Sequence, residues 1–240
     1  MEPKTAIVTG AAGTIGRAIC ESLAGKGWRV AALDLDADGL ARVEGGVLPI
    51  TCDVTDEAAV AEAFAKAGSE FGTPGIDLLV SNAGIAHPVT GPIEELSLAG
   101  WRRMTDSHLL GAFLTVRAAV PGLRARGGSI VTMSSVRAVQ AEPDCEGYGA
   151  AKGGLIGLTQ SLAVSLGPEV RANTILPGWI VPPKERPDLR EVDHGQHPAG
   201  RAGRPEDIAE AVIYLEGAGF VTGQTLVVDG GMGRKMVYAE

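Results

Sequence analysis

Short apolar runs alternate with longer segments along the whole chain, and this pattern is the main structural signal in the sequence. Seven runs have the length of a strand: residues 5–9, 29–33, 47–51, 78–81, 129–134, 171–176 and 225–228. Segments between them, such as 55–71, 101–123 and 148–166, repeat apolar residues at the spacing of a helix, and Gly167-Pro168 ends the last of these. Because strands and helices alternate throughout, the sequence predicts a parallel sheet with helices on both faces.

Size and composition predict a single α/β domain spanning residues 1–240, with 45% hydrophobic and 21% charged residues. The net charge of −8 argues against a nucleic-acid partner, which needs clustered Lys and Arg. No apolar run approaches the ~18 residues of a membrane span, and M-E-P-K-T leads directly into a strand, so neither membrane insertion nor a signal peptide is expected. Cys20, Cys52 and Cys145 lack metal-ligand spacing and are interpreted as free thiols, which predicts a cytoplasmic protein.

A glycine-rich turn, T-G-A-A-G-T-I-G, follows the first predicted strand. Glycines at 10, 13 and 16 allow a tight turn and a close approach of the backbone to a pyrophosphate, which the N-terminus of the next helix would attract. A plain strand-to-helix turn is the alternative. Ligands of parallel sheets bind where the strands end, so this turn is the first candidate for a nucleotide site.

Asp34 ends the second predicted strand, eighteen residues after Gly16. A carboxylate there can accept hydrogen bonds from the adenosine ribose of NAD. It would repel the 2′-phosphate of NADP by about 4 kcal/mol at ~4 Å and an effective dielectric near 20. Residues 10–16 contain no Lys or Arg, so NAD is the expected cofactor. Asp36 is the competing carboxylate, but a structural helix cap is the expected role for it.

Further motifs follow in order: Asp53-Val54, Asn82-Ala83-Gly84, Ser135 with Tyr148 and Lys152, Pro177-Gly178 and F-V-T-G-Q-T-L-V-V-D-G-G. With this set the chain resembles the short-chain dehydrogenase/reductase family, in its compact single-domain branch. The resemblance implies a Rossmann-like, doubly wound sheet of seven strands, a nicotinamide cofactor, a small-molecule substrate and a homotetramer or dimer. It implies that Asp53 contacts the adenine amino group and Val54 the adenine ring. The cofactor-binding set that we expect is Gly10, Gly13, Thr14, Ile15, Gly16, Asp34, Asp53, Val54, Asn82, Ala83, Gly84, Tyr148, Lys152, Pro177, Gly178 and Ile180.

Tyr148 and Lys152 are four residues apart and therefore share a helix face. A tyrosine at ~10 is too weak an acid to exchange a proton with an alcohol or ketone near neutral pH, and lowering its pKa to near 7 requires about 4 kcal/mol. The ammonium of Lys152 and the oxidised nicotinamide can supply this, and Lys152 should also hold the nicotinamide ribose. Ser135 should hold the substrate oxygen. Its neighbour Ser134 is the alternative, because only one of two successive strand residues can face the site.

Three positions depart from the family pattern. Thr14 stands where the compact branch usually has its second glycine, and the resulting spacing is more like the extended branch. Pro182 stands where the family often has a threonine on the nicotinamide carboxamide. Either Val181 or a neighbouring backbone group supplies more of that contact, or the nicotinamide is held less firmly. His108 replaces an asparagine whose main-chain carbonyl takes part in a proton relay. The ring lies on the same predicted helix face as Trp101 and Met104, and it could join the relay, be a passive buried side chain, or mark an altered site.

The pocket for the substrate is less clearly marked. Residues 183–200 are rich in Pro, Gly and charge, which predicts a mobile substrate loop. Its two histidines, His194 and His197, lack a third ligand, and no metal site is expected. His87 is a further pocket candidate. Charged residues between Ser135 and Tyr148 would indicate a polar substrate if they face the pocket, and solvent exposure is the alternative for them: Arg137, Glu142, Asp144 and Glu146.

The resulting prediction is an NAD(H)-dependent oxidoreductase that interconverts a secondary alcohol (a polyol, a sugar-like compound or another small hydroxy compound) and its ketone. Ser135, Tyr148, Lys152 and His108 are its candidate catalytic residues. Two other hypotheses remain at this stage. The departures at 14, 108 and 182 are compatible with a nucleotide-binding sensor or scaffold. The glycine spacing alone suggests an epimerase or dehydratase that retains NAD.

Overall fold

Seven parallel strands form one sheet in the computed structural model, which describes residues 2–236. The strands lie in the order β3-β2-β1-β4-β5-β6-β7, so the chain reverses its direction of travel across the sheet between β1 and β4. This is the doubly wound, Rossmann-like arrangement that the sequence predicts, and the prediction is confirmed. The strands are β1 Thr5–Thr9, β2 Arg29–Asp34, β3 Leu48–Thr51, β4 Leu78–Ser81, β5 Ser129–Met133, β6 Arg171–Pro177 and β7 Thr225–Val228.

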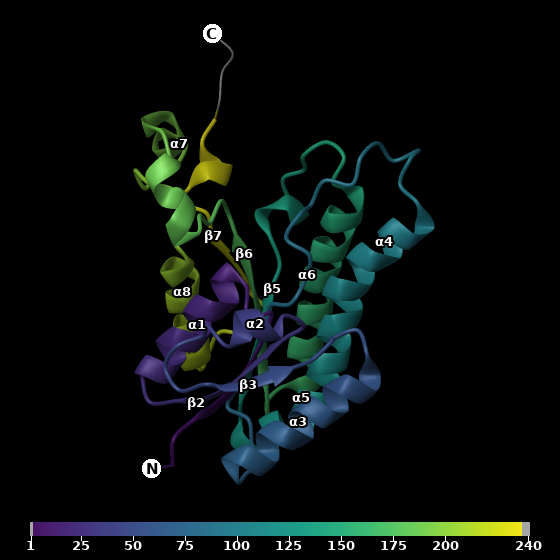
Figure 1. The fold of residues 1–240 in the computed structure, drawn as a ribbon, viewed down its shortest axis with the longest axis vertical. Helices are drawn as coiled ribbons and strands as arrows, with labels where there is room; N and C mark the ends of the chain where they lie inside the picture. Colours follow the sequence, from purple (N-terminus) through teal and green to yellow (C-terminus); the bar gives the residue numbers. More distant parts are fainter. Residues whose placement is uncertain (1, 237–240) are drawn as a thin grey trace.

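Helices cover both faces of the sheet (Figure 1). On one face lie α1 (Thr14–Gly25) and α8 (Pro205–Gly217), and on the other α3 (Glu57–Phe71), α5 (Gly111–Arg126) and α6 (Glu146–Leu166). Alternate residues of β1 point to opposite faces of the sheet. Ile7 packs into the core beneath α3, α5 and α6, whereas Ala6 and Val8 pack into the core beneath α1 and α8. Strands buried on both faces need the continuous apolar runs seen in the sequence.

The long helix expected over 101–123 is interrupted. The chain forms α4 (Leu98–Thr105), then a π-helical turn η1 (Asp106–Leu110), and then α5. The Thr105 hydroxyl donates to the carbonyl of Trp101 and the Ser107 hydroxyl to that of Met104, both at 3.1 Å, and such side-chain bonds compete with regular helical pairing. Single π turns occur often at functional sites, and this one contains His108.

The segment expected as a substrate loop contains two short helices, the 3₁₀ turn η3 (Pro183–Asp188) and α7 (Glu191–Gly195). Asp193 is buried and holds the start of α7, because its carboxylate accepts hydrogen bonds from the backbone N–H and the guanidinium of Arg190. The mobility of the segment stays a prediction. The remaining short elements are α2 Ala37–Leu40, η2 Val136–Ala138 and η4 Met232–Arg234.

Candidate active site

One cleft of about 1020 Å³ opens at the carboxyl ends of the strands, where the strand order reverses between the paired strands β1 and β4. Almost every site residue expected from the sequence lines it, from Gly10 and Asp34 at one end to Ser135, Tyr148 and Lys152 at the other. Gly16 does not line it. A Cβ on Gly16 would lie 2.1 Å from the carbonyl oxygen of Gly10, so this glycine lets the turn close on itself. Its expected contact with the cofactor stays a prediction.

The glycine-rich turn leads into α1 without strain at Thr14. Gly10 has a φ of +66°, which favours glycine, and Gly13 is the N-cap of α1. Thr14 is the first residue of this helix, where any side chain is accepted. Backbone N–H groups at a helix start are available to an anion. The departure at residue 14 therefore leaves a turn that fits a pyrophosphate.

Asp34 lies at the end of the cleft where the adenosine would sit. Its carboxylate accepts hydrogen bonds from the backbone N–H groups of Ala12 and Asp36, each at 3.0 Å. Asp36 accepts the N–H of Gly39 at 2.9 Å and caps α2, as expected of a structural residue. Arg17 is the nearest cation to the turn in sequence, but its guanidinium donates to the carbonyl of Ala12 and does not line the cleft. The carboxylate of Asp34 therefore lies beside the glycine-rich turn with no basic side chain of that turn lining the cleft.

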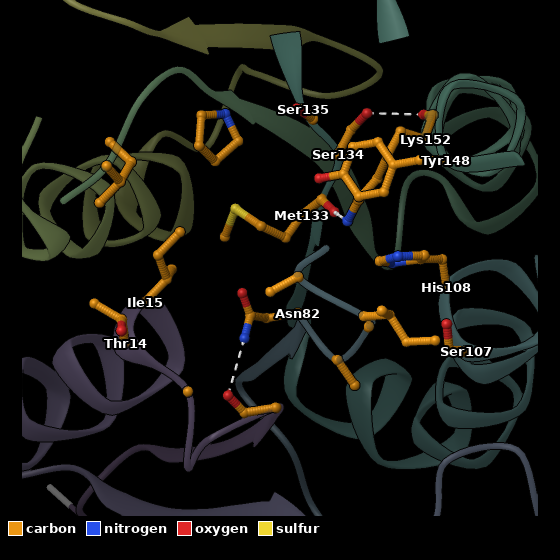
Figure 2. A pocket seen from close by; sticks show the side chains of 18 of the residues that line it. Thr14, Ile15, Asn82, Ser107, His108, Met133, Ser134, Ser135, Tyr148 and Lys152 are labelled. Carbon is orange, nitrogen blue, oxygen red and sulfur yellow. Dashed lines mark hydrogen bonds between the residues drawn. The ribbon is translucent and has the colours of Figure 1, made fainter. Parts of the chain in front are cut away.

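Asn82 braces the two central strands rather than standing free in the cleft (Figure 2). Its amide nitrogen donates to the carbonyls of Thr9 and Gly10, each at 3.1 Å. The Thr9 hydroxyl in turn accepts the N–H groups of Asn82 and Ala83 at 3.0 Å. These bonds connect the end of β4 to the glycine-rich turn, so the Asn82-Ala83-Gly84 segment sets the width of the cleft floor.

The two adjacent serines have different surroundings. The Ser134 hydroxyl donates to the Lys152 carbonyl at 2.7 Å and is thereby directed at α6. The Ser135 hydroxyl accepts the N–H of Arg137 at 3.2 Å and also interacts with Tyr148. This arrangement favours Ser135 as the residue that faces a substrate.

Burial dominates the electrostatics of Tyr148 and Lys152. It lowers the pKa of the Lys152 ammonium, whose Nζ donates to the Met133 carbonyl at 2.8 Å, to about 7. Burial also raises the pKa of Tyr148, against the smaller opposing effects of Ser135 and Arg137. The sequence argument expected Lys152 to lower the pKa of the phenol. That expectation included the oxidised nicotinamide and stays a prediction; in the protein chain alone, loss of water around Tyr148 is the largest influence and raises its pKa.

His108 is buried beside Tyr148, and their ring centroids lie 5.3 Å apart in an edge-on arrangement (Figure 2). The backbone of Ile85 approaches the ring, but neither ring nitrogen makes a hydrogen bond of good geometry among the described residues. Burial, and next the charge of Lys152, lower the pKa of His108 to about 3. The sequence argument used the ordinary imidazole pKa of ~6.5. That assumption is wrong for the folded chain, in which the ring stays neutral near pH 7.

Pro182 lines the cleft, whereas Val181 is buried and donates its N–H to the Gly203 carbonyl at 3.1 Å. The Val181 N–H is thus already paired and the residue does not line the cleft; a role for it at the nicotinamide stays a prediction. Gln196, from the segment predicted as the substrate loop, also lines the cleft. Sequence reasoning missed other lining residues, because they lie far apart in the chain or carry no motif: Gln140, Trp179 and Met232.

Charged and apolar residues both line the cleft near Ser135 and Tyr148. Arg137 and Glu142 line it, whereas Asp144, Glu146 and His87 do not. His194 accepts the N–H of Ala202 at 3.3 Å, and His197 is buried beside the Asp193 carbonyl. No group of three potential metal ligands occurs within residues 2–236, and no helix in that range is long and apolar enough to cross a bilayer.

Comparison with known proteins agrees with this geometry. Residues 10–233 match the family described as enoyl-(acyl carrier protein) reductase. The cis-4-hydroxycyclohexanecarboxylate dehydrogenase of Sinomonas cyclohexanicum is 39% identical over 95% of this chain and 96% of its own length. A glucose/ribitol dehydrogenase of Brucella melitensis, described as a short-chain dehydrogenase/reductase, is 34% identical with a TM-score of 0.87, covering 99% of this chain and 98% of its own. A 3-ketoacyl-(acyl-carrier-protein) reductase of Brucella melitensis, solved with NADH, is 31% identical with a TM-score of 0.87, covering 96% and 98%.

Gly84 lies against the ring of His108, so a side chain at residue 84 would occupy the space of the ring. A Cβ on Gly84 would lie 1.9 Å from Nδ1 of His108, so Gly84→Ala should displace the ring and lower the free energy of unfolding by about 1–3 kcal/mol. The control is Gly157→Ala on α6, where a Cβ meets no atom within 4 Å; it should raise stability by about 0.5–1 kcal/mol. Urea denaturation measures both, and equal stability of the two variants would contradict the packing described.

His108 should make the protein sensitive to acid. An unfolded histidine titrates near 6.5 and folded His108 at about 3, so between these values the unfolded state binds more protons and stability falls as the pH falls. The loss should reach about 3 kcal/mol at pH 4. His108→Asn should remove that part of the pH dependence, whereas His87→Asn, at an exposed position, should leave it. Unfolding free energies between pH 4 and 7 test this, and identical slopes for wild type and His108→Asn would refute it.

Proposed function

The chain belongs to the short-chain dehydrogenase/reductase family, and we propose that it is an NAD(H)-dependent oxidoreductase that interconverts a secondary alcohol and its ketone. The substrate class that we favour is a polyol, a sugar-like compound or another small hydroxy compound. The observation that carries the proposal is the cleft itself, which joins the glycine-rich turn and Asp34 to Ser135, Tyr148 and Lys152. The named activity of the hydroxycyclohexanecarboxylate relative supports the same chemistry.

The residues of the cleft fit a dinucleotide. The start of α1 would hold the pyrophosphate, and Asp34 would accept hydrogen bonds from the adenosine ribose. The basic side chains that line the cleft, in the part of the chain that the structure describes, are His108, Arg137 and Lys152; none comes from the glycine-rich turn or from the end of β2. A 2′-phosphate would therefore meet Asp34 without a neutralising cation. This supports NAD, as does the NADH in a related structure.

The bound nicotinamide supplies the hydride acceptor or donor. Ser135 holds the substrate oxygen through its hydroxyl, and the Tyr148 hydroxyl exchanges a proton with that oxygen. Lys152 would hold the nicotinamide ribose and place a positive charge near the phenol. Because burial raises the pKa of Tyr148, proton transfer near neutral pH depends on nearby positive charge, from Lys152, Arg137 and the oxidised nicotinamide.

The ring of His108 is neutral in this mechanism. A neutral imidazole carries one donor and one acceptor, so it can pass a proton from one nitrogen to the other without becoming charged. Both nitrogens are buried in the cleft wall, and neither makes a hydrogen bond of good geometry within residues 2–236, which is compatible with a part in a relay. The sensor and epimerase hypotheses have less support, because the catalytic groups share one cleft and Thr14 lies in an ordinary helix start.

We also propose a cytoplasmic homo-oligomer, a tetramer or a dimer. Large apolar side chains are exposed on α5, α6, α8 and β7: Phe113, Val164, Tyr214 and Val227. Burial of such side chains against another copy would remove apolar area from water.

Tyr148→Phe should lower kcat on any alcohol that the wild type oxidises by about 100- to 10,000-fold, because the proton acceptor is lost. NADH binding, followed by its fluorescence, should persist. Tyr214→Phe on α8, outside the cleft, is the matched control; it keeps the apolar ring, removes only the hydroxyl, and should retain full turnover. Near-normal turnover by Tyr148→Phe would rule out the assigned role.

Asp34→Asn should weaken the preference for NAD. The ratio of kcat/KM with NAD to that with NADP should fall by about 100- to 1000-fold, because up to about 4 kcal/mol of repulsion is removed while the acceptor for the Ala12 N–H remains. Asp36→Asn removes the same charge two residues away and should change the ratio by less than about tenfold. A wild-type preference for NADP, or equal effects of the two variants, would contradict the role of Asp34.

A further inference from the structure

An ion pair lies in the wall of the cleft at its substrate end. Arg137, two residues after Ser135, donates from Nε to Glu142 Oε2 at 2.7 Å and from Nη2 to Oε1 at 2.9 Å. Both side chains line the cleft, and the Arg137 side chain is 35% exposed. This pairing uses one edge of the guanidinium. The outer edge, formed by Nη1 and the second hydrogen of Nη2, has no other hydrogen-bond partner in the described part of the chain.

The surroundings hold Arg137 in place. The Ser135 hydroxyl accepts its backbone N–H, and a Cβ on Gly149 of α6 would lie 3.6 Å from its carbonyl oxygen. Glu142 restricts the side chain from the other end through two hydrogen bonds. When one edge of a planar guanidinium is restrained, its other edge has a fixed orientation. The N–H groups of that free edge can form two parallel hydrogen bonds to a carboxylate.

The charges along the cleft are unevenly distributed. Three of its lining carboxylates, Asp34, Asp36 and Asp53, follow β2 and β3 at the adenosine end. At the substrate end Glu142 is the lining carboxylate, and it is already paired with Arg137. Lys152 lies on the same side of the cleft and has a carbonyl rather than a carboxylate as its partner. An anionic group on the substrate would therefore meet two basic side chains and one paired acid there.

We propose that the outer edge of Arg137 binds a carboxylate of the substrate, so that the enzyme acts on hydroxy acids and the corresponding oxo acids. Glu142 is a positioning residue that holds the guanidinium toward the cleft. The carboxylate is bound and not transformed, while the hydroxyl carbon faces Ser135 and Tyr148. This inference rests on the proposed function, because it names the substrate class of the same site.

The test compares hydroxy acids with their neutral carboxamides: 3-hydroxybutyrate and cis- and trans-4-hydroxycyclohexanecarboxylate, each beside its amide, together with xylitol and sorbitol. With NAD, the better acid should exceed its amide in kcat/KM by about 10- to 100-fold, the range for hydrogen bonds to charged groups. Arg137→Gln should bring this acid-to-amide ratio close to one. Arg137→Lys keeps the positive charge but loses the planar pair of N–H donors, and should retain an intermediate acid-to-amide ratio.

The matched control is Arg124→Gln. Arg124 also forms an ion pair with a glutamate, Glu169, at 2.9 Å, but it does not line the cleft. Its replacement changes the net charge by the same amount and should leave the acid-to-amide ratio unchanged. A fall of the ratio in both variants would indicate the overall field of the protein and overturn the proposal.

A second measurement requires no turnover. Cyclohexanecarboxylate, which has no hydroxyl to oxidise, should bind the NADH complex more tightly than cyclohexanecarboxamide, as reported by NADH fluorescence, and Arg137→Gln should abolish the difference. Equal activity and equal binding of acids and amides, or a preference for xylitol and sorbitol, would overturn the proposal while leaving the oxidoreductase intact. Carboxylate binding that depends on Arg137, without oxidation of any hydroxy compound, would support the subsite and reject the proposed function.

Discussion

The buried ammonium of Lys152 donates to the carbonyl of Met133, and this contact joins α6 to the carboxyl end of β5. The Ser134 hydroxyl makes a second connection to the Lys152 carbonyl. Together they determine where Tyr148 stands relative to Ser135, because these two residues lie on the elements that are joined. A buried amine is costly unless it is hydrogen-bonded, so the chain has few alternative arrangements at this point. The same burial that orders the site also lowers the pKa of Lys152.

The nucleotide end depends on a separate set of contacts. Asn82 and the hydroxyl of Thr9 connect β4 to the turn after β1, and Gly16 allows the turn to close against Gly10. Since the strand order reverses between β1 and β4, the helices that follow these strands diverge to opposite faces. The cleft is the space between them. Its two ends are thus held by different hydrogen bonds, and substitutions at 14 and 182 leave both sets in place.

His108 shows how an unexpected side chain at a family position can be accommodated without changing the fold. The ring fills space against Gly84 and touches Tyr148 edge-on, where an asparagine would be smaller. Its neutral state follows from the loss of water and from the charge of Lys152. A charged imidazole here would oppose the ammonium that the site requires. The π-helical turn around it was not expected, because a continuous apolar face does not reveal one extra residue in a turn.

The local sequence determined the seven strands, their parallel arrangement and the residues that gather at their ends. The spacing of apolar residues and the residues that end strands and helices act over only a few positions. Strand ends differed from the prediction by only one residue at β2, β3, β5 and β6. Tertiary structure decided what depends on distant neighbours. It directed Ser134 toward α6, placed Arg137 and Glu142 in the cleft but not Asp144 or Glu146, and raised the pKa of Tyr148 through burial. The physical reason is that the cost of removing water from a group depends on what packs around it, and those atoms come from segments far away in the chain.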